Sequence, residues 1–245
     1  MKQLLLFLAG NSLLAGTAQA QATFHVGPRV GLSVASAHFA DTYQASYSSR
    51  SGVEAGLTGS LQVGHFALQP SVLFSQKGYR NSYALRYIDP PIPTEPGTVD
   101  EAVRLNYLTL PLNLAFTLGR AGQGLQVFGG PYVGLLLGGN YTTRIHEGSY
   151  YPGGSSNDRE QVRQMQAGSV VANPSSDNAY SQCFDVGLQA GLGYRFNGVL
   201  VQASYGVGLR NLAVQYEINA YIYNPTAYYN RSFQLSLSYL VGPRS

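Results

Sequence analysis

The sequence predicts an all-β protein: an eight-stranded antiparallel transmembrane β-barrel of the outer-membrane type, following a cleaved signal peptide. Three observations indicate this fold class. The 245-residue chain opens with a short apolar targeting segment, the segments after it alternate apolar and small polar residues, and its connections are alternately short and long. Strict alternation is typical of a strand whose two faces meet different environments. Short turns at one end and long loops at the other are typical of outer-membrane barrels.

The first twenty residues form the predicted signal peptide. Lys2 supplies the positive charge, and an apolar run extends from Leu4 to Ala15. A small-x-small tripeptide, Ala-Gln-Ala, ends at Ala20, so we expect cleavage after Ala20, with Ala22 as the alternative boundary. Residues 1–20 are therefore assigned to the signal peptide and residues 21–245 to one outer-membrane β-barrel domain.

Eight segments of the mature chain alternate with a period of two. In the clearest, every second residue from Phe184 to Phe196 is apolar or aromatic, and Gly, Gln, Asp and Arg lie between them. Most segments exceed the roughly five or six residues of an average strand and reach the roughly 9–11 that a membrane-crossing strand needs. The predicted strands are 24–35, 53–63, 66–77, 108–118, 125–141, 184–196, 199–210 and 232–241.

Two features of these segments suggest local irregularity. Each internal proline removes a ladder donor and is a candidate position for a β-bulge. The apolar parity also changes near Tyr107 and Leu108, which indicates either a bulge or the point where the strand leaves the membrane. The prolines concerned are Pro28, Pro70, Pro111 and Pro131.

The connections support the barrel. Gly64-His65, 119–124 and Asn197-Gly198 are predicted tight turns, and Asn-Gly is the strongest short hairpin signal. The other connections are long and rich in polar turn formers: 40–51, 81–100, 144–181 and 218–228. If the first strand starts at the periplasmic end, the long loops are extracellular. The longest, 144–181, is the expected surface-interaction segment, and we expect that excising about residues 148–178 would remove no ladder hydrogen bonds.

The composition indicates which strand face meets lipid. Only 11% of residues are charged, against roughly 25% in an average soluble domain. The face opposite the apolar one carries Gly, Ser, Thr, Gln and Asn rather than the Lys and Glu of a water-exposed surface. We therefore expect the apolar face to contact outer-membrane lipid and the small polar face to fill the lumen. The alternative is a soluble, exported, lipocalin-like barrel whose apolar face lines a ligand cavity.

Six charged residues fall on the predicted lumen face. An eight-stranded barrel is just wide enough for side chains to fill it, and an unpaired buried charge is costly, so we expect these residues to pair within the lumen. An ion or proton path is the functional alternative. The predicted lumen charge network is Arg29, Glu54, Lys77, Asp185, Arg195 and Arg210.

Tyrosines crowd the predicted loop side. We expect some to form an aromatic girdle at the level of the lipid headgroups, and others to pack within loops or to bind a sugar or a protein. The tyrosines concerned are Tyr43, Tyr47, Tyr79, Tyr83, Tyr87, Tyr107, Tyr141, Tyr150, Tyr151, Tyr221, Tyr223, Tyr228 and Tyr229.

The sequence offers little catalytic chemistry. Among the four histidines, His38 is best placed for a lipid A-modifying hydrolase, but no nucleophile or carboxylate at recognisable spacing accompanies it. The single cysteine, Cys183, excludes a disulfide framework or a Cys-rich zinc site, and the net charge of +3 gives no dense basic patch for nucleic acid. We predict no enzyme, no cofactor, and no catalytic, cofactor-binding or metal-binding residue.

Three segments carry a family resemblance: LNYLTLPLNLAF at 105–116, GGPYVGLLLG at 129–138 and FDVGLQAGLGYRF at 184–196. With the segments 27–33 and 233–239, they resemble the outer-membrane β-barrel family of Bacteroidetes that includes the PorT-like proteins. The resemblance covers nearly the whole mature chain. It implies the barrel fold and an outer-membrane location, and it suggests a link to protein secretion or gliding as one role.

Together these features predict a non-enzymatic integral outer-membrane protein of a Gram-negative bacterium, with a structural or surface-interaction role. We expect a monomeric barrel whose partners are outer-membrane lipid and a surface or secretion-system protein. The alternative function is that of an accessory to a secretion or gliding system. A soluble lipocalin-like ligand binder and a lipid A-modifying hydrolase are less favoured.

Overall fold

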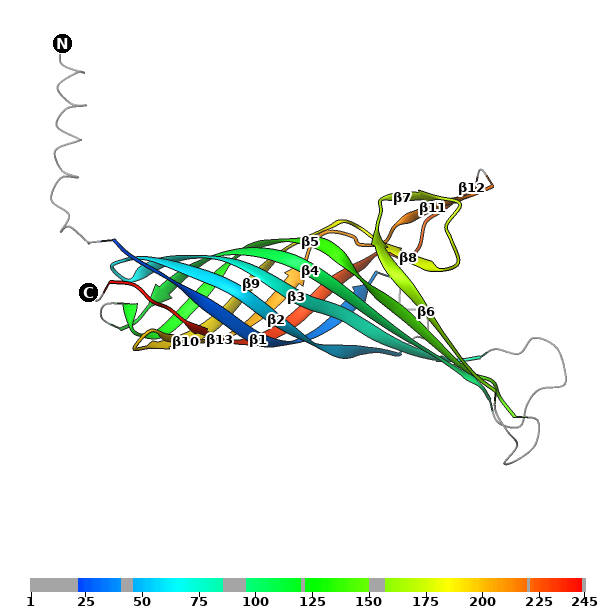
Figure 1. Ribbon diagram of the computed structural model, residues 1–245, viewed down its shortest axis with the longest axis horizontal. Coiled ribbons are helices and arrows are strands. Elements are labelled where there is room, and N and C mark those ends of the chain that lie inside the picture. Colours follow the sequence, from blue (N-terminus) through cyan, green and yellow to red (C-terminus); the bar gives the residue numbers. More distant parts are fainter. Residues whose placement is uncertain are drawn as a thin grey trace, which may run out of the picture.

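The computed structural model describes residues 22–40, 46–85, 96–119, 122–149, 157–219 and 221–243. Within them, eight long strands form a closed antiparallel barrel in the order β4-β3-β2-β1-β13-β10-β9-β5, with β5 pairing back onto β4 (Figure 1). The strands are β1 (Thr23–Phe39), β2 (Ser46–Val63), β3 (Phe66–Ala84), β4 (Thr98–Thr117), β5 (Gly124–His146), β9 (Phe184–Phe196), β10 (Val199–Gly208) and β13 (Tyr228–Tyr239). The predicted fold class is confirmed, whereas the predicted signal peptide lies outside the described residues.

The barrel closes where the first strand meets the last. β1 pairs with β13 from Arg29 opposite Ser238 to Phe39 opposite Tyr228, and with β2 along its other edge. Each barrel strand therefore has a hydrogen-bonded neighbour on both sides. No helix among the described residues is long and apolar enough to cross a membrane.

The tight turns lie at one end of the barrel, near both chain termini (Figure 1). Asn197 and Gly198 have φ angles of 47° and 85°. Positive φ at both central residues is the geometry of a type I′ turn, whose twist matches that of the two strands it joins. The hairpin predicted from Asn-Gly is confirmed.

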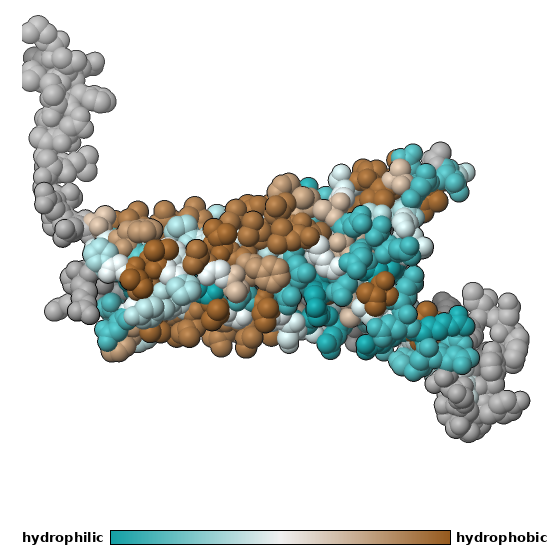
Figure 2. Space-filling model, in the orientation of Figure 1, coloured by the Kyte–Doolittle hydropathy of each residue, from teal (hydrophilic) through white to brown (hydrophobic). Residues whose placement is uncertain are grey.

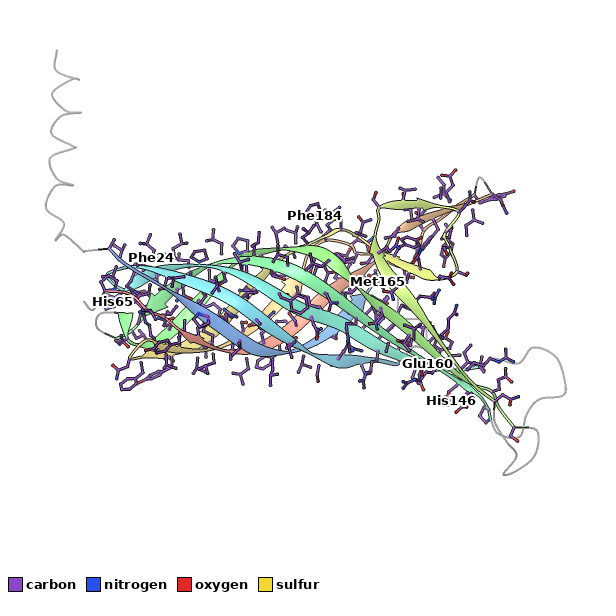
Figure 3. The ribbon with its side chains drawn as sticks, viewed as in Figure 1. Phe24, His65, His146, Glu160, Met165 and Phe184 are labelled. Carbon is purple, nitrogen blue, oxygen red and sulfur yellow. The ribbon has the colours of Figure 1, made fainter. Side chains whose placement is uncertain are left out.

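An apolar band surrounds the barrel (Figure 2). Along each strand, alternate residues expose large apolar side chains, and the residues between them are buried in the lumen. On β1 the exposed series runs from Phe24 to Val34, and on β9 from Phe184 to Phe196. Figure 3 shows Phe24 and Phe184 toward opposite ends of this band. The apolar face thus points outward, which is the opposite of the lipocalin-like alternative.

Six aromatic residues of the outer surface gather at the short-turn end. There they form an outward girdle at the edge of the apolar band, where amphipathic and aromatic rings favour the headgroup region. The girdle comprises Phe24, Phe66, Phe116, Tyr194, Phe196 and Tyr239, each at least 40% exposed.

On the loop side the strands continue beyond the band and flare apart (Figure 1). β6 (Asp158–Ala167) extends the barrel sheet by pairing with the outer half of β5, from Gly139 opposite Met165 to His146 opposite Asp158. β8 (Asn178–Ser181) runs parallel to β6. β7 (Val170–Ala172), β11 (Gln215–Ile218) and β12 (Tyr221–Tyr223) form a separate small sheet.

The extension corrects the prediction for residues 144–181. That segment is not a loop without ladder hydrogen bonds, because β6, β7 and β8 all lie within it, and excising residues 148–178 would remove the pairing of β6 with β5. The alternation that identifies a membrane strand is missing from β6. Most side chains of its sequence, DREQVRQMQA, are exposed to water. Only the free outer edge of β5 makes it a strand.

The parity change in β4 marks the level at which the strand leaves the membrane, which is the second of the two predicted causes. Val103, Leu105 and Tyr107 are buried, and the same parity continues inward with Thr109 and Asn113. What changes is the interior, which is polar beside the membrane and apolar above it. A register shift does lie between Asn106 and Tyr107, opposite Gly138 and Leu136.

That shift places an extra residue, Leu137, in β5, so the bulge lies on the partner strand and not in β4, where it was predicted. The expectation of bulges at the prolines is wrong, since pairing continues in register through all of them. Their partners are Leu57 for Pro28, Leu112 for Pro70, Tyr132 for Pro111 and Leu188 for Pro131.

The apolar band predicts a depth-dependent cost for a new charge. Val30 is 56% exposed near the middle of the band on β1. We expect Val30→Arg to lower the free energy of unfolding in lipid vesicles by about 2–4 kcal/mol, because the guanidinium would lie near the bilayer midplane. The matched control is His38→Arg, on the same strand but above the band, with a cost of about 0–1 kcal/mol. Urea titration in vesicles measures both, and equal costs would contradict the assignment of the band.

Candidate functional site

The lumen beside the membrane holds two buried ion pairs. The first joins β1 to β2: Arg29 Nη2 lies 3.0 Å from Glu54 Oε1, and both side chains are at most 2% exposed. Arg29 Nη1 also donates a hydrogen bond of 3.1 Å to Gln202 Oε1 on β10. A guanidinium can make these contacts together because its five donors spread in a planar fork. Arg29 therefore ties three strands from inside the barrel.

The second pair joins β3 to β9. Lys77 Nζ lies 2.8 Å from Asp185 Oδ2, and Asn230 Nδ2 donates to the same oxygen at 2.9 Å. The ammonium also lies 4.1 Å from the centre of the Tyr132 ring, a cation–π contact. The charge of Lys77 is thus met by a carboxylate and an aromatic face in a site closed to solvent.

A row of glutamines completes the closure of the lumen. Gln202 Nε2 donates to Gln69 Oε1 at 3.0 Å, and Gln69 Nε2 donates to Gln126 Oε1 at 3.1 Å. With Arg29 and Glu54, this chain of hydrogen bonds runs from β2 through β1, β10 and β3 to β5. Side chains from opposite walls therefore meet across the lumen, as expected for a barrel of eight strands.

The other two residues of the predicted lumen charge network, Arg195 and Arg210, belong to neither ion pair. Arg195 is 2% exposed at the short-turn end, and its Nε and Nη1 atoms have no hydrogen-bond partner among the described residues. It lines a cavity of about 610 Å³ together with His25. Arg210 corrects the prediction, because it is exposed outside the lumen and lies 6.0 Å from the Phe184 ring. β10 ends at Gly208, so the alternation that placed Arg210 inward stops before it.

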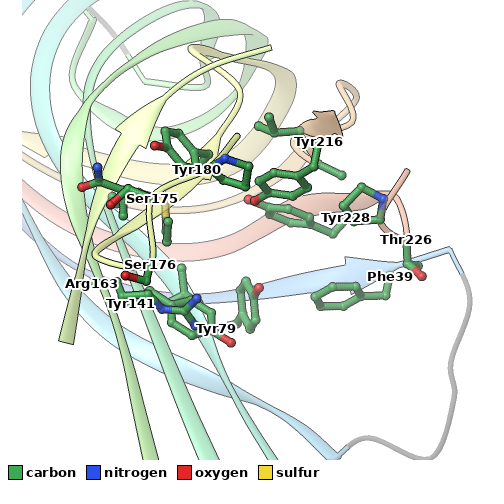
Figure 4. Close-up of a pocket in the computed structure, with 18 of the residues that line it drawn as sticks. Phe39, Tyr79, Tyr141, Arg163, Ser175, Ser176, Tyr180, Tyr216, Thr226 and Tyr228 are labelled. Carbon is green, nitrogen blue, oxygen red and sulfur yellow. The ribbon is translucent and has the colours of Figure 1, made fainter. Parts of the chain in front are cut away.

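At the loop side the barrel opens into a cavity of about 520 Å³ (Figure 4). We call this cavity the outer mouth. It lies between the extended sheet and the segments that carry β8 and β11. Its floor includes Val103, Met165 and Val214, which are all buried. Its aromatic lining consists of Phe39, Tyr47, Tyr79, Tyr141, Tyr180, Tyr216 and Tyr228.

The rings of the outer mouth pack against one another. Phe39 stacks on Tyr47 with ring centres 4.1 Å apart, and Tyr79 lies edge-on to Phe39 at 5.3 Å. Tyr228 stacks on Phe39 at 5.5 Å, and its hydroxyl lies 2.8 Å from Ser181 Oγ. Contacts of this kind hold rings rigidly, so the lining is preorganised.

Two charged groups contact Tyr141. Tyr141 donates a hydrogen bond to Glu101, and Arg163 lies 4.4 Å over the Tyr141 ring. Burial raises the pKa of Tyr216 above its ordinary value, so its hydroxyl stays protonated and able to donate at neutral pH. The mouth therefore offers ring faces beside hydrogen-bond donors.

The outer mouth corrects the prediction for the tyrosines. Five residues named as candidates for a loop-side girdle face inward instead: Tyr47, Tyr79, Tyr107, Tyr141 and Tyr228. Tyr221 and Tyr223 are exposed on β12, Tyr83 is 39% exposed, and Tyr229 is partly exposed. Tyr43, Tyr87, Tyr150 and Tyr151 lie outside the described residues. The missed signal is that Tyr79 and Tyr107 share the parity of the lumen residues Lys77 and Thr109 on their own strands.

The histidines do not gather into a catalytic group. His38 is exposed on β1, and His65 Nδ1 lies 2.8 Å from the Thr117 carbonyl oxygen in a tight turn. His146 ends β5 beside Asp158, 2.8 Å away. Cys183 is a free thiol. Among the described residues, no three His, Cys, Asp or Glu side chains are grouped so that they could hold a metal ion.

Residues 18–214 match the family model described as "Outer membrane protein beta-barrel domain". The chain belongs to this family. With its outward apolar band, the protein is therefore an integral outer-membrane β-barrel of a Gram-negative bacterium. No curated protein matches the sequence.

Three solved structures illustrate the likeness. One is Ail, the attachment invasion locus protein of Yersinia pestis, whose structure was solved with the heparin analogue sucrose octasulfate. Its sequence is 10% identical to this chain and its TM-score is 0.37. The match covers 89% of this chain and 99% of Ail. Neisserial surface protein A is also 10% identical, with a TM-score of 0.37, and the match covers 88% of this chain and 96% of that protein. OprG from Pseudomonas aeruginosa is 11% identical, with a TM-score of 0.34, and the match covers 91% of this chain and 97% of OprG.

The lumen pairs predict a marked asymmetry between single and double substitutions. Asp185→Leu leaves the buried ammonium of Lys77 without its carboxylate, and we expect a loss of about 3–5 kcal/mol in the free energy of unfolding. Adding Lys77→Met should restore most of that loss, because both charges are then absent. Glu160→Leu, which breaks the exposed pair with Arg144, is the control, with a cost of about 0–1 kcal/mol. Urea titration in vesicles reports each value, and an additive double variant would show that the pair is not coupled.

Proposed function

We propose that the protein is a non-enzymatic binding protein of the cell surface that holds a sugar-sized ligand in its outer mouth. The observation that carries this proposal is the cavity of about 520 Å³ lined by seven aromatic side chains. Its volume lies within the roughly 300–1,000 Å³ of ordinary small-molecule sites. Its position above the apolar band, between the long connections, faces the outside of the cell.

The lining favours a ligand with one flat apolar face and several hydroxyl groups. Ring faces contact the apolar side of such a molecule, as a pyranose presents one. Arg163, Ser175, Ser176, Asn178 and Thr226 line the same cavity and supply donors and acceptors (Figure 4). A purely apolar ligand would leave these polar groups without partners, which costs affinity.

Binding rather than passage or catalysis follows from what lies beneath the mouth. A row of hydrogen-bonded glutamines crosses the lumen: Gln202, Gln69 and Gln126. The two buried ion pairs join β1 to β2 and β3 to β9 within the same lumen. A ligand in the mouth therefore meets a closed floor. No acid, base and nucleophile are grouped around the described histidines, so the pocket supports recognition and not the hydrolase alternative.

A second candidate function is that of an accessory to a protein-secretion or gliding system, as the PorT-like resemblance suggests. The observation in its favour is the cavity of about 610 Å³ at the short-turn end, where Arg195 and His25 lie. Site-specific crosslinking in intact cells separates the two functions. Capture of a protein from Gln123, in that cavity, supports the accessory role, whereas capture only from Tyr221 supports the surface role.

Tyrosine fluorescence tests the proposed site directly, because the chain contains no tryptophan. Tyr180 and Tyr216 line the mouth from the loops, with ring centres 6.3 Å apart, and lie outside the barrel strands. For a glycan selected from an array of cell-surface sugars, we expect Tyr180→Ala and Tyr216→Ala each to weaken binding about 10-fold, through the loss of roughly 1 kcal/mol of ring contact together with its packing.

The matched control is Tyr221→Ala, on the same side of the molecule but 80% exposed. Its affinity should stay within about twofold of the unaltered protein, since a surface ring away from the site contributes little. Tyr216→Phe separates the hydroxyl from the ring. Equal affinity of all variants, or an array that retains no glycan, would contradict the proposed site.

A further inference from the structure

Unpaired arginines lie on the outer surface immediately above the apolar band on the loop side. Arg80 and Arg104 share the outward face of their strands with the lipid-facing Phe74 and Leu110. Arg50 lies next to Arg80 on the neighbouring strand β2 and lines the same groove. These three arginines form what we call the arginine cluster.

The pairing registers place the cluster around one glycine. Arg104 is opposite Gly78, and Arg80 is two residues farther along the same strand as Gly78. Diagonal neighbours on one face of a sheet are roughly 7–8 Å apart. Ser48 is opposite Arg80, and Arg50 follows it in the stretch between Ser49 and Glu54 where the register of β2 against β3 shifts. Gly78 is buried, and a Cβ atom there would meet the Val103 backbone carbonyl, so no side chain stands between the arginines at this position.

The arginines of the cluster lack the carboxylates that arginines farther from the membrane have. Arg144 lies 2.9 Å from Glu160, and Arg159 lies 2.9 Å from Glu147. Arg50, Arg80 and Arg104 form no ion pair with another described residue. Like charges brought this close repel, so the cluster is suited to an anion supplied from outside the chain.

Two grooves flank the cluster. One, of about 450 Å³, is lined by Arg50, Arg80 and Arg144 together with the carboxylates of Asp100, Glu101 and Glu160. Glu160 pairs with Arg144, and Glu101 accepts hydrogen bonds from Asn81 and Tyr141. The other, of about 600 Å³, combines the lipid-facing Phe74 and Leu137 with Arg104. Amides of Asn106, Asn140, Gln164 and Gln166 complete it. A molecule in this second groove would meet apolar side chains at the level of the band and polar, basic ones above it.

The positive charge continues around this rim beyond the cluster. Arg231 lies on the outer face of β13, two residues before Phe233 and nearer to the loops. Its Nε atom has no hydrogen-bond partner among the described residues. Arg210 lies beside Phe184 at the same edge. At the short-turn end the outward girdle is aromatic, and the described arginine there, Arg195, points inward. Among the described residues, outward-facing arginines therefore lie at the loop-side rim and not at the short-turn rim.

We infer that the arginine cluster binds the phosphorylated headgroup of a glycolipid in the outer leaflet. Phosphate accepts two parallel N–H hydrogen bonds from a guanidinium, and three arginines around Gly78 can hold one or two phosphates. The sugar hydroxyls meet the amides of the second groove, and the acyl chains lie on Phe74 and Leu137. The site is separate from the outer mouth, whose side chains point into the barrel.

Native mass spectrometry tests this inference on the full-length protein in detergent micelles. The probe is bis-phosphorylated lipid A, with enzymatically dephosphorylated lipid A and inorganic phosphate as parallel probes. The variant is the triple substitution Arg50→Gln, Arg80→Gln and Arg104→Gln. The matched control is Arg159→Gln, which removes a paired arginine of the same sheet that lines neither groove. Heat-modifiable migration in gels verifies that each variant is folded.

We expect bis-phosphorylated lipid A to remain bound to the unaltered protein and the control, with affinities within about twofold. The triple variant should bind at least about 10-fold more weakly, since each charge-assisted contact contributes more than a neutral hydrogen bond. Dephosphorylated lipid A should bind all forms as weakly as the triple variant binds the intact lipid. Equal retention by the triple variant, equal binding of the dephosphorylated lipid, or tight binding of inorganic phosphate alone would overturn the assignment of a glycolipid site.

Discussion

The structure depends on one constraint: within lipid, every backbone N–H and C=O must find a partner in the chain itself. An open sheet would leave the outer edges of β1 and β13 unpaired, at a cost of several kcal/mol per group. Their pairing from Arg29–Ser238 to Phe39–Tyr228 closes the ring. Closure with eight strands leaves a lumen so narrow that side chains must fill it. The barrel's outward apolar face and its crowded interior follow from the same condition.

A filled lumen demands that its polar groups satisfy one another. Arg29 with Glu54 and Lys77 with Asp185 do so as ion pairs, and the glutamines on β10, β3 and β5 do so as a relay of amide hydrogen bonds. These contacts join strands far apart in the ring, so they brace the barrel against flattening. A floor built this way also separates the outer mouth from the short-turn end, and each end can recognise a different partner.

Much of the barrel was predictable from sequence because lipid imposes a period of two on every strand that crosses it. The Asn197-Gly198 turn and the segment 184–196 follow from that pattern and from local turn chemistry. The pattern fails above the band, where water contacts the outside: β6 has no alternation, and only the free edge of β5 organises it. For the same reason Arg210, beyond the end of β10, was misplaced, and the sequence did not separate the inward tyrosines from the candidates for a girdle.

Two solvents act on the same strand, and this explains where recognition is located. Along β4, the residues that face inward change from Thr117 and Asn113 beside lipid to Leu105 and Val103 above it, while the outward ones change from Leu110 to Arg104. Where water replaces lipid outside, an apolar interior becomes favourable again and an outward charge ceases to be costly. The height on the barrel wall at which water replaces lipid is the height of the lipid headgroups. An aromatic cavity inside and a basic rim outside are therefore consequences of one boundary crossing the barrel wall, and the chain needs no separate domain to carry either.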